Sequence, residues 1–301
     1  MRKAVHHASD CRFSDRPSIR TPILAMVILF RIRAARHFWW GESLDDLEER
    51  VRQRIENLRL ILLRSEPPTS VSVPARELAI DEIPNAREVQ GRSGKCLWIE
   101  KEIDAYLDTN ALAESASQVL SDEGETPSFM FLDLETTGLA ATPLFLAGTA
   151  FMDRDKLKVV QLLARDYSEE AAVVSILDDL LSRFDTCITF NGKSFDIPYL
   201  RERSKYHKID LRSAPRHFDL LHHARRAWKH CLPNCRLITL EWYILGRRRI
   251  GDVPGWEVPC IYHDFVHTKD ARRLTVVIRH NLMDILSMAE LLVILAETKR
   301  C

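Results

Sequence analysis

Residues 129–138 constrain this chain more than any other stretch. The run Phe-Met-Phe-Leu-Asp-Leu-Glu-Thr-Thr-Gly is apolar around its first carboxylate and stops at a turn, which predicts a buried strand that ends in two acidic residues. Residues two apart in a strand point to the same face, so Asp133 and Glu135 are expected to lie side by side. Two neighbouring anions repel each other unless a cation lies between them, and their oxygens suit Mg²⁺ or Mn²⁺. The alternative is a strand end that emerges into solvent.

Charge and cysteine content limit the partners and the compartment. Lys+Arg and Asp+Glu are equal at 43 each, so a nucleic-acid partner requires a local basic patch rather than a global positive field. The seven cysteines are odd in number and scattered, which favours the reducing cytoplasm over a disulfide scaffold. Cys231 and Cys235 beside His230 could form half of a zinc site, although no second pair of ligands stands at a fitting distance in the sequence. The apolar run 23–30 is too short to span a bilayer and is followed by arginines, so we expect no membrane segment.

The hydrophobic pattern divides the chain into three parts. Residues 1–93 are expected to form an N-terminal extension with an amphipathic helix at 43–64 and a proline-rich connection after it. The single apolar stripe of that helix packs on the following domain or meets a protein partner. Residues 94–127 contain a short strand at 96–99 and a linker or short helix. The main domain is expected at 128–298.

A third carboxylate follows a second buried strand. The run 187–190 is a short apolar strand that ends at Asn-Gly, and Asp196 then opens a helix with Pro198 in its first turn. This strand is expected to end at the same sheet edge as Asp133, which brings Asp196 toward the same ions. The alternative is that Asp196 acts only as a helix cap.

The last long helix, predicted at 271–298, carries a histidine and a fourth carboxylate. His280 and Asp284 are four residues apart, so they lie on one helix face, and their neighbours are mostly apolar. Polar groups in such surroundings are costly unless something pairs with them. A purely structural His-Asp contact is the alternative.

The order of predicted elements indicates a mixed α/β fold. After the strand at 129, further strands at 145–152 and 157–164 are joined by a polar turn, which predicts an antiparallel hairpin. Ser168 is expected to cap a helix that precedes the strand at 187–190. With the first strand in the middle, this order fits a ribonuclease H-like mixed sheet flanked by helices.

Together the three acidic motifs resemble those of the DEDD (DnaQ-like) superfamily of 3′-to-5′ exonucleases. The likeness is greatest to the YprB-type ribonuclease H-like proteins, which share Asn-Gly-Lys-Ser-Phe-Asp at 191–196, His-x-Asp-Leu-Leu at 217–221 and Asp-Val-Pro-Gly at 252–255. The resemblance covers about 94–295. It implies that Asp133, Glu135, Asp196 and Asp284 hold two Mg²⁺ or Mn²⁺ ions and that His280 takes a proton from the attacking water.

Two features depart from the pattern of these exonucleases. His280 and Asp284 have the spacing of the branch that carries tyrosine, yet the residue present is the histidine of the other branch. The loop 140–144 lacks the glycines of YprB-type relatives, so it is expected to shape the substrate mouth differently.

Substrate contacts are expected from residues near the acidic motifs. The resemblance nominates Thr136, Thr137 and Leu139 for the terminal nucleotide, while Asn191 and Lys193 stand where sugar or phosphate would pass. Two basic clusters are expected either to follow a nucleic-acid backbone or to be solvated helix ends. These clusters consist of His222, His223, Arg225 and Arg226, and of Arg247, Arg248 and Arg249. Asp219 is expected to support the site rather than to bind an ion.

The sequence thus predicts a cytoplasmic, metal-dependent 3′-5′ exonuclease that hydrolyses single-stranded or frayed DNA or RNA. Two alternatives remain open: a nucleic-acid-binding protein that kept the fold and lost turnover, and a structure-specific endonuclease. The choice between DNA and RNA depends on how the pocket treats the 2′-hydroxyl, and the sequence leaves it open.

Overall fold

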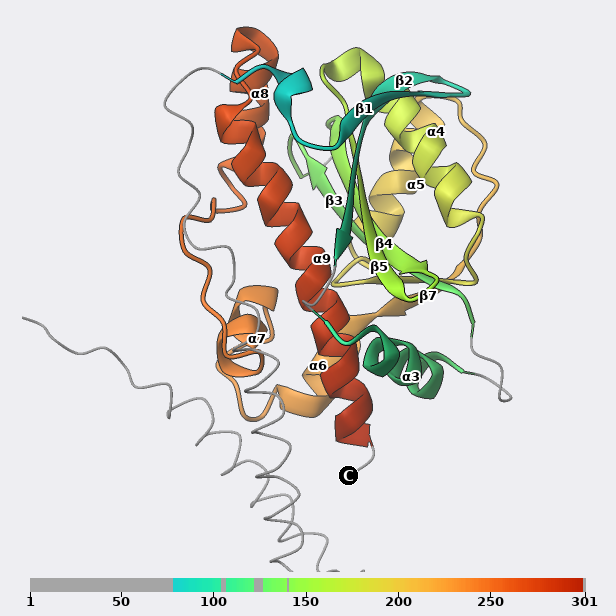
Figure 1. The fold of residues 1–301 in the computed structure, drawn as a ribbon, viewed down its shortest axis with the longest axis vertical. Helices are drawn as coiled ribbons and strands as arrows, with labels where there is room; N and C mark the ends of the chain where they lie inside the picture. Colours follow the sequence, from blue (N-terminus) through green and yellow to red (C-terminus); the bar gives the residue numbers. More distant parts are fainter. Residues whose placement is uncertain (1–77, 104–106, 122–126, 140, 300–301) are drawn as a thin grey trace, which may run out of the picture.

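The computed structural model describes residues 78–103, 107–121, 127–139 and 141–299 (Figure 1). The predicted helix at 43–64 and the connection that follows it, up to residue 77, lie outside the described residues. The strands are β1 (Ala86–Gly91), β2 (Gly94–Ile103), β3 (Phe129–Thr136), β4 (Leu144–Asp153), β5 (Lys156–Leu163), β6 (Thr186–Thr189) and β7 (Arg216–Asp219). The helices are α3 (Thr109–Leu120), α4 (Glu170–Leu181), α5 (Asp196–Tyr206), α6 (Leu220–Trp228), α7 (Leu237–Tyr243), α8 (Val258–Thr268) and α9 (Arg272–Lys299), with short 3₁₀ turns at Ile80–Glu82 and Tyr167–Glu169.

In the described residues, the seven strands form one mixed sheet in the order β1-β2-β5-β4-β3-β6-β7. The strands β3, β4 and β5 form an antiparallel meander, and the β4–β5 turn makes the predicted hairpin. The chain then crosses over through α4 and adds β6 and β7 parallel to β3 on its other side. The carboxyl ends of β3, β6 and β7 therefore meet at one edge of the sheet, as expected for parallel strands.

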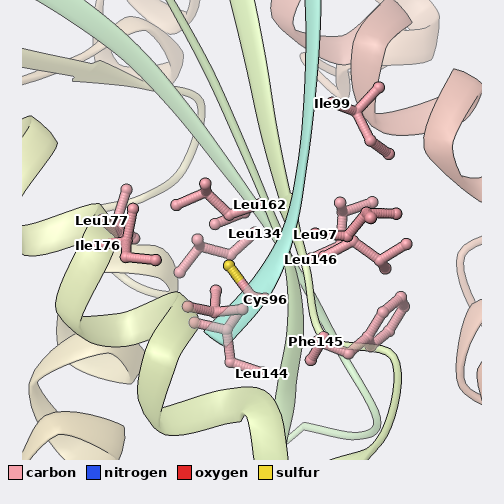
Figure 2. Close-up of a cluster of buried hydrophobic side chains, with 14 of the residues drawn as sticks. Cys96, Leu97, Ile99, Leu134, Leu144, Phe145, Leu146, Leu162, Ile176 and Leu177 are labelled. Carbon is pink, nitrogen blue, oxygen red and sulfur yellow. The ribbon is translucent and has the colours of Figure 1, made fainter. Parts of the chain in front are cut away.

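The core occupies both faces of the sheet. Figure 2 shows Leu134 and Leu162 on the side where Ile176 and Leu177 of α4 pack, whereas Leu146 lies on the opposite side. The α9 helix covers that opposite side, contacts β3, β4 and β5, and packs against α3, α6, α7 and α8 (Figure 1). Because both faces are covered, β3 is apolar along most of its length and exposes only its acidic end.

The fold class predicted from the sequence is confirmed, and the predicted strands at 145–152, 157–164 and 187–190 correspond to β4, β5 and β6. The stretch expected as a linker or short helix forms α3, whose first turn is capped by the Asp108 carboxylate. Among the described residues, none of the helices is long and apolar enough for a bilayer crossing.

Two details differ from the sequence interpretation. Residues 86–91, expected within an extended connection, form β1 and pair with β2, so the sheet continues well before residue 128. As an edge strand, β1 is largely solvent-exposed and lacks the apolar run that marks a buried strand. Ser168 does not cap α4; the Asp166 carboxylate accepts hydrogen bonds from Ser168 instead and starts a 3₁₀ turn before the helix.

Candidate active site

The acidic end of β3 faces α9. Asp133 and Glu135 share the strand face of Phe129 and Phe131, which pack in the core beneath α9, while the residues between them face α4. Both carboxylates keep a partly exposed edge at the end of the strand. Because α9 packs against this face of β3, the alternative that the strand end simply emerges into solvent does not describe the site.

The approach of α9 to β3 depends on Gly148 of β4 and on hydrogen bonds of the Asn281 side chain. Gly148 of β4 pairs with Asp133, and a Cβ at this position would lie 1.9 Å from Asn281 Oδ1 and 2.5 Å from Ile285 Cδ1. Asn281 Nδ2 donates to Asp133 Oδ2 at 2.8 Å and to the Asp133 carbonyl at 3.2 Å. Gln161 of β5 donates to Asn281 Oδ1 at 2.8 Å, so this buried amide is held from both sides. The position of Asp133 is thereby coupled to the helix.

Asp196 reaches the same edge from the start of α5. It is 4% exposed, and its Oδ1 accepts a hydrogen bond from the backbone amide of Leu134 at 3.1 Å. The residue that precedes the helix is Phe195, whose side chain makes no cap. Asp196 therefore binds across to β3, which goes beyond the helix-capping alternative.

The four carboxylates lie close enough to repel one another. Burial, followed by repulsion from Asp284, raises the pKa of Asp133 and that of Glu135 well above their ordinary values. Burial raises the pKa of Asp196 to about 7, and the charges of Asp219 and Asp284 add to this shift. Negative charge at this edge is thus incompletely balanced by the protein, and a cation would relieve it.

His280 is held by a fifth carboxylate. Its Nδ1 lies 2.8 Å from Asp252 Oδ1, and its Nε2 lies 3.6 Å from Asp284 Oδ2. Burial by itself lowers the pKa of His280, but the hydrogen bond to Asp252 and the charge of Asp284 outweigh it and raise this pKa. The contact to Asp252 directs Nε2 toward the acidic cluster.

Arg249 brings a positive charge into the cluster. Its Nε and Nη2 donate to the two oxygens of the buried Glu241 carboxylate, and Nη2 also donates to Asp284. A further nitrogen lies 3.2 Å from Asp252 Oδ2. The side chain is 7% exposed, and the pKa of Arg249 is raised because the charges and hydrogen bonds of Asp284 and Glu241 outweigh burial.

The predicted basic cluster at 247–249 therefore needs correction. Arg247 is also buried and pairs with Glu290 at 2.7 Å, while only Arg248 points to solvent, with its guanidinium 5.2 Å from the ring centre of Trp242. The acids Glu241 and Glu290 explain this, because burial of a carboxylate without a positive partner is strongly unfavourable. A run of three arginines looks the same in sequence whether it faces inward or outward.

The residues after the acidic pair build a tight turn. The Thr136 hydroxyl donates to the Gly138 carbonyl at 2.6 Å, and the Thr137 hydroxyl and amide both donate to the Pro143 carbonyl. The Tyr199 hydroxyl donates to the Thr142 carbonyl at 2.7 Å, which ties this turn to α5. Leu139 is 90% exposed at the rim.

The other predicted substrate residues divide into two groups. Asn191 and Lys193 are exposed, and their backbone amides donate to the two oxygens of Asp219, which also caps α6 through Leu221. Asp219 thus shapes the loop that leads to Asp196, in line with its expected supporting role. Arg225 is exposed on α6, where it is near enough to Cys235 to influence its thiol, and no contact among the described residues joins it to the acidic cluster.

The donor set suits a hard divalent cation. Carboxylate oxygens from β3, α5 and α9 converge on one edge with unrelieved repulsion, and Mg²⁺ and Mn²⁺ prefer such ligands. In their present rotamers, no three His, Cys, Asp or Glu side chains of the described ranges are close enough to hold one ion. Asp284 is drawn to Arg249 and Asp133 to Asn281, so ion binding would require these side chains to rotate. The thiol of Cys235 is buried and lies 4.0 Å from the Ala224 carbonyl, whereas Cys231 is exposed, which gives no support to a zinc half-site.

Several residues around the cluster escaped the sequence interpretation. Asp252 and Arg249 enter from the loop between α7 and α8, and Glu241 enters from α7. Gly148 had a visible signal, because a glycine inside an apolar strand often marks a close approach of another segment. Asp252 stood in a motif shared with known proteins, but nothing local indicated its contact with His280.

Comparison with known proteins gives one family. A family model described as the RNase_H superfamily matches residues 130–296. The chain is similar to the uncharacterized protein YprB of Bacillus subtilis (strain 168), with 38% identity over 182 residues. This match covers 58% of the chain and 44% of that protein, so the chain spans less than half of the length of this relative.

Two solved structures are similar to parts of this chain at low identity. One is the family B DNA polymerase from the hyperthermophilic archaeon Pyrobaculum calidifontis, with 17% identity, a TM-score of 0.45 and coverage of 56% of this chain and 24% of that one. The other is E. coli Exonuclease I in complex with a dA16 oligonucleotide, with 16% identity, a TM-score of 0.31 and coverage of 52% of this chain and 45% of that one.

Proposed function

The chain belongs to the RNase H superfamily, and on that premise we propose that it is a metal-dependent nuclease that removes nucleotides from the 3′ end of single-stranded or frayed DNA or RNA. One observation carries the proposal: Asp133, Glu135, Asp196 and Asp284 come from three separate elements and crowd one another at a single edge of the sheet. Burying four like charges together is unfavourable without a cation, so the arrangement is best explained by ions that the site binds during its work.

The four carboxylates would hold two Mg²⁺ or Mn²⁺ ions. Such ions, when bound, supply the positive charge that activates a water nucleophile and stabilises the leaving 3′ oxygen of the phosphodiester. Asn281 keeps Asp133 in place from the side of α9, and the Leu134 amide keeps Asp196 in place from the side of β3. These contacts hold both carboxylates at the sheet edge, and the side chain of Asp133 would rotate from Asn281 to take up an ion.

His280 is proposed to take the proton of the attacking water. Asp252 occupies Nδ1, which leaves Nε2 on the side of Asp284 as the nitrogen that can accept a proton. The unusual spacing between His280 and Asp284 does not prevent this role, because the four-residue step still places both on the same face of α9.

The turn after β3 and the loop before α5 are proposed to receive the terminal nucleotide. Leu139 projects at the rim, and the Thr136 and Thr137 hydroxyls hold the turn that carries it. Asn191 and Lys193 lie in the loop that leads to Asp196, where a sugar or a phosphate would pass. Arg225 is proposed to meet the strand farther from the reacting bond.

A labelled-strand assay tests the proposal. We expect purified full-length protein to shorten 5′-labelled single-stranded DNA or RNA stepwise with Mg²⁺ or Mn²⁺, and to do nothing in EDTA. Asp133→Asn should abolish cleavage, since Asn retains an acceptor for Asn281 but removes the charge. Asp153→Asn is the matched control, because Asp153 is an exposed carboxylate at the β4–β5 turn.

Each other outcome has a definite meaning. Cleavage by Asp133→Asn at the wild-type rate would defeat the assignment of this cluster. Cutting of a circular single strand would replace the exonuclease with a structure-specific endonuclease. Binding of the strands without cleavage in any metal would leave a binding protein on a nuclease fold.

A further inference from the structure

The loop between α7 and α8, residues 244–257 (Figure 1), buries several charged side chains and exposes two large apolar ones. Three of its charged side chains, Arg247, Arg249 and Asp252, turn inward to partners in the protein, whereas Arg248 faces solvent. Two of its large apolar side chains turn outward: Ile250 is 68% exposed and Trp256 is 76% exposed. A loop on a soluble protein ordinarily shows the opposite arrangement, so the outer face of this loop calls for an explanation.

The loop is firmly held, so the exposure is built into the fold. Gly251 has a φ of +69°, a conformation that glycine adopts without strain, and it separates outward-facing Ile250 from inward-facing Asp252. Arg249 is anchored by two bonds to Glu241, and Asp252 is bonded to His280. Beyond them, a turn closed by the Glu257 amide and the Pro254 carbonyl at 2.8 Å leads into α8.

The exposed side chains lie close to the acidic cluster. Ile250 directly follows Arg249, which donates a hydrogen bond to Asp284. Trp256 is four residues after Asp252, so the Cα atoms of Asp252 and Trp256 are at most ~14 Å apart. Leu139, 90% exposed, stands in the turn that follows the acidic end of β3. Exposed apolar side chains therefore occur in two of the segments that supply the acidic cluster.

Charge favours nucleobases over phosphates as the group bound here. Arg247 and Arg249 are engaged in internal ion pairs, and only Arg248 of the three faces solvent. The chain has no net charge, and without bound ions the carboxylates of the site repel a phosphate backbone. A single strand can still gain affinity by stacking its bases on an exposed aromatic ring, which requires no positive charge.

We propose that Trp256, together with Ile250 of the same loop, is a stacking platform for the unpaired bases of a single-stranded nucleic acid whose end enters the acidic site. This inference rests on the proposed function, since it assigns the substrate class of the same site. The platform binds the faces of unstacked bases. It should therefore bind single strands of any sequence and should not bind base-paired duplex.

Oligonucleotide binding tests the platform. The probes are fluorescein-labelled 12-mers of dT and of U, measured by anisotropy on the full-length Asp133→Asn protein with Mg²⁺ so that no strand is cut. We expect Trp256→Ala to weaken binding about tenfold, as loss of one stacked base does, and Trp256→Phe to retain most of it. Tyr206→Ala is the matched control: Tyr206 is 69% exposed but lies at the far end of α5, ~15 Å along the helix from Asp196.

An abasic strand of the same length separates stacking from backbone contact. The parent protein should bind this strand as weakly as the Trp256→Ala protein binds dT, and Trp256→Ala should cause no further loss. The affinity should also depend only weakly on salt, with a slope that corresponds to one or two phosphates.

Two results would overturn the platform. One is equal binding of the 12-mers by the parent and Trp256→Ala; the other is an equal loss on the abasic strand, which would place Trp256 against the backbone. If wild-type protein still degrades labelled strands in either case, the stacking role of Trp256 is refuted while the proposed nuclease function is retained. If wild-type protein neither binds nor cuts the strands, both proposals fail.

Discussion

Removing one negative charge from the acidic cluster should stabilise the metal-free protein at high pH. Asp196 is the residue of choice because it is almost completely buried, and an asparagine can still accept the hydrogen bond from the Leu134 amide. We therefore expect Asp196→Asn to keep the local geometry while removing the cost of burying a negative charge and, with it, the repulsion from Asp219 and Asp284.

The magnitude follows from the raised pKa of Asp196. A shift from the ordinary 3.8 to about 7 corresponds to ~4 kcal/mol of unfolding free energy at 1.36 kcal/mol per pH unit. Because the pKa is raised on folding, the favourable contribution is complete below pH 3.8 and is lost as the pH rises through about 7. Metal-free wild-type protein should thus lose stability over this window, and Asp196→Asn should not.

Thermal unfolding in EDTA at about pH 4 and about pH 8 measures the difference. At the higher pH, the variant should unfold roughly 10 °C above wild type, given 2–4 °C per kcal/mol for a domain of this size. At the lower pH the two should agree. Mn²⁺ should raise the unfolding temperature of wild type more than that of the variant, because the variant has lost a proposed ligand.

Asp153→Asn is the control, since this exposed carboxylate has a lowered pKa owing to its hydrogen bond with Lys158 and gains nothing from neutralisation. Identical unfolding temperatures for wild type and Asp196→Asn at about pH 8 in EDTA would refute the reasoning that a negative charge on Asp196 destabilises the metal-free protein. A difference that persists unchanged at about pH 4 would show that the substitution acts through packing instead.

Three further substitutions probe the surroundings of the cluster. Gly148→Ala should lower the unfolding free energy by roughly 1–3 kcal/mol and reduce nuclease activity, because a Cβ would lie 1.9 Å from Asn281 Oδ1. Thermal unfolding measures the loss of stability, and the labelled-strand assay measures the loss of activity. Asp252→Asn should move the acid limb of the pH–rate profile to lower pH, because its hydrogen bond raises the pKa of His280, and should reduce the plateau rate roughly 10- to 100-fold. Asp219→Ala should raise KM and lower the unfolding free energy by about 1–2 kcal/mol, since two loop amides and a helix lose their acceptor; steady-state kinetics and urea unfolding measure these effects.

Controls for these variants come from the same chain. Gly255→Ala should leave stability unchanged, because a Cβ there meets nothing within 4 Å, and an equal loss in both glycine variants would contradict the role of Gly148. For Asp252→Asn, an unshifted acid limb would indicate that His280 is not the titrating group. For Asp219→Ala, an unchanged KM would separate the loop 191–193 from substrate binding.

The local patterns of the sequence were sufficient to predict the fold and the convergence of the acids. An acidic pair at a strand end, an acid at a helix start and a His-Asp step on a helix each depend only on neighbouring residues. Parallel strands bring their carboxyl ends together, so the meeting of Asp133 and Asp196 follows from the order of the elements.

The remaining parts depend on contacts between distant segments. Nothing near Asp252 in the sequence reveals that His280 will be its partner, 28 residues further on. The inward turn of Arg249 is determined by Glu241, which itself is buried only because α7 packs against α9. The edge strand β1 was missed for a different reason, since a half-exposed strand does not need the apolar run by which buried strands are recognised.

The architecture of α9 also determines when the site can exist during synthesis. Asp133 and Asn281 are 148 residues apart in the chain, so at 5–20 residues per second the ribosome needs roughly 7–30 s to make the second after the first. During this interval the apolar sheet face beneath α9 has no cover, and the carboxylates of β3 lack their partners from the helix. A nascent chain is therefore expected to need protection from aggregation at that face, and its acidic cluster is incomplete until α9 docks.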